Sequence, residues 1–159
     1  MKTNFLFPNS WKIVGWLLFI PGIVLVLVGS FLNMSIDDIL QTKVLAVYSD
    51  PFLGTSGWFE WVENGIADEL LTVMVIGGGL LVGFSKMKNE DEMIASLRYE
   101  SLVWATYLNY GIILFTTLFV FGVAYMNVLI HNLFTLLFFF ILRFHYRIYS
   151  VSKSADHEE

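Results

Sequence analysis

Residues 84–104, FSKMKNEDEMIASLRYESLVW, form a long charged stretch between two strongly apolar segments. The flanking segments have the composition of membrane-spanning helices. Asn89 followed by Glu92 matches the capping-box pattern that begins a helix, and no helix breaker follows between Glu90 and Phe121. The stretch therefore predicts a cytoplasmic turn and then a third helix that begins outside the lipid and continues into it.

The composition of the whole chain indicates an integral membrane protein. The 159 residues are 57% hydrophobic and 14% charged, with a mean hydropathy of +0.68. A soluble domain would be about 25% charged. The chain has no cysteine, which excludes disulfides, thiolate metal sites and cysteine nucleophiles.

Four segments are apolar for long enough to cross a hydrocarbon layer of about 30 Å. They cover about residues 13–32, 66–84, 102–125 and 128–145. An outer loop over 33–65, a cytoplasmic loop over 85–101 and a polar, mobile tail over 150–159 complete the chain. We predict an all-α integral membrane protein: a single domain over 1–159, folded as a four-transmembrane-helix bundle whose third helix extends into the cytoplasm.

The outer loop is predicted to be amphipathic. Ser35 is placed to cap a short helix with one apolar face, formed by Ile36, Ile39, Leu40, Val44 and Val47. Trp58, Phe59 and Trp61 follow and suit a headgroup boundary. At the far end of the third span, residues 125–127 are predicted to form the tight turn into the fourth.

Glycines predict where the helices pack closely. Gly15, Gly22 and Gly29 recur every seven residues along the first span, and Gly79 and Gly83 form a small-xxx-small pair in the second. Small residues at these spacings let neighbouring helices approach each other in a membrane. These five glycines are therefore predicted helix-packing positions.

The basic residues predict the orientation of the chain. With four spans, only Lys43 falls in the outer loop, and the other lysines and arginines fall on one side: Lys2, Lys12, Lys86, Lys88, Arg98, Arg143, Arg147 and Lys153. Positive residues are retained in the cytoplasm. The asymmetry predicts cytoplasmic N- and C-termini.

Polar residues within the third span recur at helical spacing. This polar stripe consists of Thr106, Asn109, Tyr110, Thr116 and Thr117. Polar side chains that face lipid would lack hydrogen-bond partners. The stripe therefore faces other helices, either in interhelical hydrogen bonds or as the lining of a polar cavity.

The charged stretch is the best candidate for a surface that binds a cytoplasmic protein. Its members are Lys86, Lys88, Glu90, Asp91, Glu92, Arg98 and Glu100. Helix capping and charge anchoring explain the lysines and the first three acids without a partner. They do not explain Arg98 and Glu100 on a projecting helix, nor its apolar face of Met93, Ile94 and Leu97, which headgroups, the bundle or a soluble partner would have to cover.

No motif predicts catalysis. HExxH, GxSxG and P-loop patterns are absent, and His131 and His145 each lack an acidic or histidine neighbour at ligand spacing. Asp68 and Glu69 with Asn64 suit either a helix start or a cation site. We predict no catalytic residue, no cofactor, no metal site and no direct contact with nucleic acid.

Four segments carry a resemblance to a known family: ENGIADEL (63–70), FSKMKNEDE (84–92), LRYESLVWA (97–105) and LNYGI (108–112). They resemble the pattern NNxxDE, FSKxKxEDExIxxLRxxSLxWA and NY of a family of four-pass bacterial membrane proteins without an established activity. Gly65 stands where the family pattern has a second Asn. The resemblance implies an inner-membrane location and genes often placed beside helix-turn-helix or LytTR-type regulators.

Three functions remain open from the sequence. The first is a non-enzymatic protein that senses the envelope or membrane, or tethers a cytoplasmic partner, regulatory or otherwise, through residues 85–104. The second is an oligomeric channel or small transporter, which would need several copies of the chain around the polar stripe. The third is a lipid-binding accessory factor that uses Trp58, Trp61 and the outer loop. The candidate partners are thus membrane lipid, a cytoplasmic protein and further copies of the chain.

Overall fold

The computed structural model describes residues 5–32, 40–50 and 56–156. The elements follow in the order α1 (Trp11–Leu32), β1 (Gln41–Ser49), β2 (Gly57–Gly65), α2 (Ala67–Phe84), α3 (Glu92–Phe119) and α4 (Val123–Asp156). All four helices are long and apolar enough to cross a membrane. The prediction of a mostly helical chain with four such helices is confirmed.

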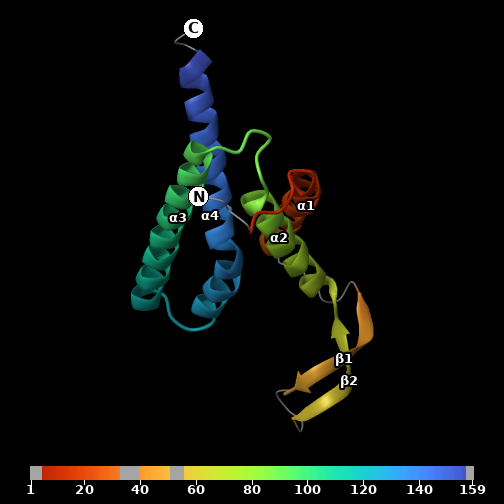
Figure 1. Cartoon of the computed structure of the whole chain (residues 1–159). Coiled ribbons are helices and arrows are strands. Elements are labelled where there is room, and N and C mark those ends of the chain that lie inside the picture. Colours follow the sequence, from red (N-terminus) through yellow and green to blue (C-terminus); the bar gives the residue numbers. More distant parts are fainter. Residues whose placement is uncertain (1–4, 33–39, 51–55, 157–159) are drawn as a thin grey trace.

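The helices form two pairs, α1 with α2 and α3 with α4, and α2 packs against α4 to join them (Figure 1). Val75 and Val82 of α2 and Phe140 and Phe144 of α4 are fully buried and belong to one hydrophobic core cluster. Large apolar side chains on the outward faces stay exposed, such as Leu17 at 68%. An apolar surface of this extent needs a hydrocarbon layer or a partner to cover it.

The segment before α2 contains an antiparallel β-hairpin, so the all-α prediction and the predicted helix through Val44 and Val47 are wrong. β1 and β2 pair from Gln41 opposite Gly65 to Ser49 opposite Gly57. Apolar and aromatic residues suit this pairing, since they form cross-strand contacts that a lone short helix would lack. The start of the predicted helix, from Ser35 to Ile39, lies outside the described residues.

The hairpin extends from the start of α2, away from α3 and α4 (Figure 1). Its aromatic side chains Trp58, Phe59 and Trp61 are each about two-thirds exposed. Phe59 adopts a left-handed backbone conformation, with φ of 56°. The predicted location of these aromatics at a headgroup boundary stays a prediction.

The start of α3 differs from the capping-box prediction. Asp91 occupies the N-cap position, and its Oδ1 accepts a hydrogen bond of 2.7 Å from the backbone N–H of Ile94. Asn89 is therefore not the cap, and Glu92 is the first residue of the helix. Glu90 precedes the N-cap, and its carboxylate binds the backbone N–H of Met87 and the side chain of Arg98.

The turn between α3 and α4 lies earlier than predicted. α3 ends at Phe119, and Gly122 has φ of +72°, a conformation that glycine adopts without steric cost. Residues 125–127, the predicted turn, belong to α4. α4 then continues to Asp156, so residues 150–156 of the predicted tail are helical.

The predicted glycines lie at helix contacts. A Cβ on Gly15 would approach Val82 N of α2 to 2.9 Å, and one on Gly22 would approach Val75 Cγ2 to 2.8 Å. Gly29 is also buried. On α2, a Cβ on Gly79 would meet Phe19 at 3.2 Å, and one on Gly83 would meet the ring of Phe140 at 2.5 Å. Close helix approach of this kind is what small residues permit.

Candidate functional site

One end of the bundle carries nearly all the basic residues. We call it the basic end: it contains the first turns of α1 and α3, the last turns of α2 and α4, and the loop 85–91. Among the described residues, every lysine and arginine except Lys43 of the hairpin lies there. α3 has 28 residues and α4 has 34. At about 1.5 Å per residue both exceed a hydrocarbon layer of about 30 Å, and α4 continues past the start of α3 (Figure 1).

Arg98, a predicted member of the partner surface, lies inside the basic end and is only 6% exposed. Its Nη1 donates to Glu90 Oε1 at 2.5 Å, and its Nη2 donates to Glu90 Oε2 at 3.2 Å and to the carbonyl oxygen of Ser85 at 3.3 Å. Its guanidinium carbon lies 4.9 Å from the ring centroid of Phe144. One side chain of α3 thus links the chain after α2 to α4.

Glu90 completes this linkage. Its Oε2 also accepts a hydrogen bond of 2.7 Å from the backbone N–H of Met87. Burial by itself would raise the pKa of Glu90, but the hydrogen bonds from Arg98 and Met87 and the positive charge of Arg98 outweigh it. The net effect holds the pKa of Glu90 below its usual value of 4.5.

This lowered pKa predicts acid sensitivity of the basic end. The stabilisation from ionised Glu90 is present in full above the unfolded-state pKa near 4.5 and is lost as pH falls through the lower folded-state pKa. We expect the free energy of unfolding in micelles to fall below about pH 4.5 more steeply for the natural chain than for Glu90→Gln, which has no carboxylate to protonate. Equal slopes for the two proteins would contradict the pairing.

The chain before α1 is fixed to the same region. The N–H of Phe7 donates to the carbonyl oxygen of Phe84 at 2.9 Å, and the N–H of Lys86 donates to the carbonyl oxygen of Phe7 at 2.9 Å. Ser85, between them, is fully buried. The start of the described chain, the end of α2 and Arg98 of α3 therefore meet in one place.

Two further basic side chains lie nearby. Lys12 of α1 is half-buried, and its Nζ lies 2.9 Å from Met87 Sδ, a weak acceptor. His145 of α4 packs edge-on against Trp16 with ring centroids 5.2 Å apart. Its Nδ1 lies 2.9 Å from the carbonyl oxygen of Ile141, while its buried Nε2 has no partner among the described residues.

The other charged candidates lie on the surface of the basic end. Lys86, Lys88, Asp91 and Glu92 are exposed. Glu100 of α3 lies 3.5 Å from Arg147 of α4, and both side chains are about half exposed. The structure therefore separates the predicted cluster into an internal pair, Glu90 with Arg98, and an exposed set.

The bundle itself covers most of the apolar face of α3. Leu97 is buried, and Ile94 packs partly buried against the core. Met93 stays 52% exposed. Packing within the bundle, and not headgroups or a soluble partner, therefore covers Leu97 and Ile94.

The polar stripe of α3 does not form one continuous surface. Asn109 is buried and exchanges amide hydrogen bonds with Asn132 of α4, at 3.1 and 3.4 Å. The hydroxyls of Thr106, Thr116 and Thr117 donate to backbone carbonyls one turn earlier, and that of Thr117 also contacts Tyr125 OH at 2.9 Å. Tyr110 is 58% exposed.

The remaining candidates lie at the opposite, hairpin end. His131 of α4 lies 3.1 Å from Ser30 Oγ of α1. Asn64 belongs to β2 and donates to Glu69 Oε1 at 2.6 Å, so it does not cap α2, whose N-cap position is Ile66 without a side-chain hydrogen bond. Within the described part of the chain, no group of three or more His, Asp or Glu side chains could hold a metal ion.

Sequence reasoning missed several groups of this site. The sequence alone assigns no site role to Lys12, Ser85 or Met87. It also does not predict the contact between Asn109 and Asn132. A buried arginine needs a carboxylate close by, but Asp91 and Glu92 are nearer to Arg98 in the chain than Glu90 is. The sequence therefore gives no signal that selects Glu90 as the partner of Arg98.

No protein-family model matches the chain, and neither a curated protein nor a solved structure matches it significantly.

Proposed function

We propose that this chain is a non-enzymatic bacterial inner-membrane protein, with cytoplasmic termini, that tethers a cytoplasmic protein at its basic end. The asymmetry of lysine and arginine between the two ends supports this orientation. The resemblance over residues 63–112 supports a bacterial membrane family and a partner encoded nearby.

The observation that carries the proposal is the projecting pair of helices, α3 and α4, at the basic end. The internal Arg98–Glu90 pair holds them in place, so their exposed faces can present a preformed surface. The exposed faces bear Tyr99 on α3 and Tyr146 and Tyr149 on α4, each at least 66% exposed and in the same helical turns as the Glu100–Arg147 ion pair. Tyrosine and arginine are enriched at the centres of protein interfaces.

Photo-crosslinking in native membranes tests this surface. We expect a photoactivatable residue in place of Tyr149 to capture one defined cytoplasmic protein. The matched control replaces Tyr107, which is 76% exposed on α3 but lies within the apolar part of that helix. The same set of captured proteins from both positions would count against a specific surface.

A substitution then measures its contribution to binding. Tyr149→Ala is expected to weaken the captured interaction about tenfold or more, since truncated interface anchors commonly cost about 2 kcal/mol. Tyr107→Ala should leave the interaction unchanged. Unaltered binding of the Tyr149→Ala chain, with normal membrane insertion, would contradict the proposed tether.

A channel or small transporter formed by several copies is the alternative proposal. The observation that favours it is the exposure of Tyr110, since its hydroxyl on a lipid-facing surface would lack partners unless another copy covered it. Solute or ion flux in proteoliposomes tests this alternative, with Tyr110→Phe expected to reduce flux. Vesicles that stay impermeable to solutes and ions at high protein density would contradict the channel or transporter.

A further inference from the structure

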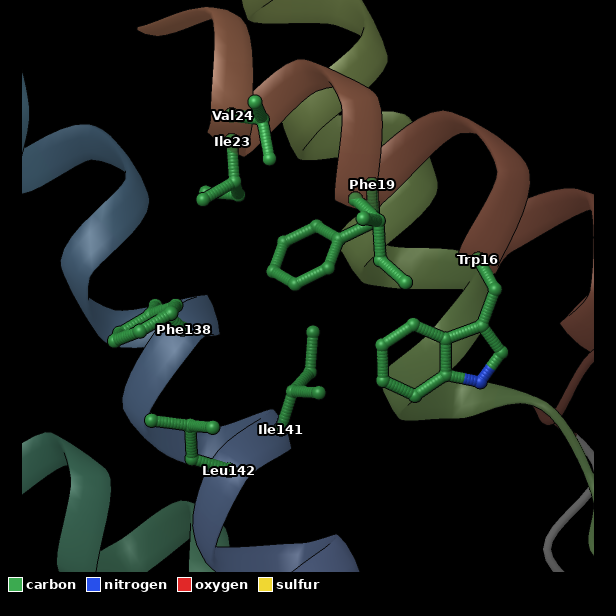
Figure 2. A pocket seen from close by; sticks show the side chains of 8 residues that line it. Trp16, Phe19, Ile23, Val24, Phe138, Ile141 and Leu142 are labelled. Carbon is green, nitrogen blue, oxygen red and sulfur yellow. The ribbon is translucent and has the colours of Figure 1, made fainter. Parts of the chain in front are cut away.

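A hollow of about 190 Å³ lies between α1 and α4. Its lining consists of Trp16, Phe19, Ile20, Ile23 and Val24 from α1 and Phe138, Ile141 and Leu142 from α4. Figure 2 shows the side chains of the two helices pointing toward each other across it. Phe19 and Ile141 are buried at its floor, while Ile20 and Leu142 are each 53% exposed at its rims.

The hollow faces outward between two helices whose outer surfaces are apolar. Along α1 (Trp11–Leu32) the lining extends from Trp16 to Val24, just past the middle of the helix, and in α4 it lies between Phe138 and Leu142, directly before Arg143. In a membrane, the hollow would therefore open toward the acyl chains between the basic end and the middle of the hydrocarbon layer. An apolar cavity of about 150 Å³ is enough to bind a small hydrocarbon.

Polar groups lie one helical turn beyond the hollow, toward the basic end. Lys12 precedes Trp16 by four residues, and His145 follows Ile141 by four residues, so each shares a helix face with a lining residue. The ring of His145 packs edge-on against Trp16 and against Phe144, whose ring also contacts the guanidinium of Arg98.

The charges in this region do not balance. Lys12 contacts Met87, whose backbone N–H binds Glu90, and the two carboxylate oxygens of Glu90 are already hydrogen-bonded to Arg98. The ammonium of Lys12 keeps only a thioether contact among the described residues. A second anion is the group that would best complement this excess of positive charge.

We propose that the hollow binds one acyl chain of an anionic phospholipid, whose phosphate lies against Lys12. A phospholipid carries both an apolar chain and a negative charge. These match the hollow and the ammonium of Lys12, which lie one helical turn apart. A second copy of the chain fits less well, since a helix with its side chains is about 10 Å across and the hollow holds only a few methylene groups.

Tryptophan fluorescence tests the proposal, because Trp16 lines the hollow. A chain that retains only Trp16 carries Trp11→Phe, Trp58→Phe, Trp61→Phe and Trp104→Phe. It is reconstituted in equimolar phosphatidylcholine and phosphatidylglycerol, with bromine on the acyl chains of one lipid or the other. We expect brominated phosphatidylglycerol to quench Trp16 more, with a relative binding constant of about five, the factor for one lysine near an anionic lipid.

Matched variants separate headgroup from acyl-chain contacts. Lys12→Gln should reduce the relative binding constant to about one, while Lys86→Gln, which removes an exposed lysine of the same end, should leave it unchanged. Ile20→Phe should fill the rim of the hollow and lower quenching by either lipid. Leu17→Phe, at an exposed position of α1 outside the hollow, should not.

Three results would overturn the proposal. Equal quenching by the two brominated lipids in the starting chain would show that no anionic lipid is selected. Selectivity that survives Lys12→Gln would assign it to other groups. Absence of quenching by either lipid, together with a dimeric mass in native mass spectrometry, would show that another copy covers the hollow.

Discussion

Arg98→Ala is expected to lower the free energy of unfolding by about 3–5 kcal/mol, measured by denaturant titration in mixed micelles. The loss would be large because the variant leaves the carboxylate of Glu90 without its partner in a region where that side chain is only 18% exposed. It would also remove the contact of the guanidinium with Phe144 and its hydrogen bond to the carbonyl oxygen of Ser85.

A second ion pair of the same end provides the control. Arg147 and Glu100 also join α3 to α4, but at 3.5 Å and with both side chains about half exposed. Arg147→Ala should therefore change the free energy of unfolding by at most about 1 kcal/mol. Arg98→Lys should fall between the two, since an ammonium keeps the charge but cannot form the two-pronged contact with Glu90. Similar losses for Arg98→Ala and Arg147→Ala would show that burial of the Arg98 pair contributes nothing.

The position of Arg98 changes how a partner should be sought. Charge reversal at a buried arginine would alter the joint between α2, α3 and α4, so any lost interaction would reflect a changed fold. Substitutions at exposed residues of α3 and α4, such as Glu100 and Tyr149, change the surface and leave the joint intact.

The four helices could be predicted because their signal is local. Each requires only a continuous apolar run of sufficient length, and α2 ends at Phe84 as the sequence predicted. The hairpin could not be predicted the same way. Val44 and Val47 fit one face of a helix as well as a strand, and only pairing with β2, some 20 residues later in the chain, separates the two.

The residue types of the candidate site could be predicted from the sequence, but which of its charged side chains are buried could not. The basic residues around 84–104 do lie at one end of the bundle. Whether a given charge is buried depends on α4, which brings Phe144, more than 40 residues later in the chain, over Arg98. The spacing of Arg98 along α3 carries no information about that contact, so the exposed and internal charges could not be separated.

Gly78→Leu is expected to separate α1 from α2, with a loss of at least about 3 kcal/mol, the upper part of the range for overpacking. A Cβ on Gly78 would lie 2.6 Å from the backbone nitrogen of Phe19 and 2.9 Å from the carbonyl oxygen of Gly15. These are backbone atoms of α1, so no side chain can rotate to make room. Even Gly78→Ala should cost about 1–3 kcal/mol for the same reason.

The neighbouring glycine makes this prediction selective. A Cβ on Gly77 would meet nothing within 4 Å, so Gly77→Ala adds the same methyl group to the same helix without a clash. It should leave the free energy of unfolding unchanged or raise it by up to about 1 kcal/mol, since alanine favours a helix more than glycine does. If Gly77→Ala and Gly78→Ala had equal effects, the cost would come from the helix itself. Opposite effects would show that the close approach of Gly78 to Gly15 holds the first pair of helices together.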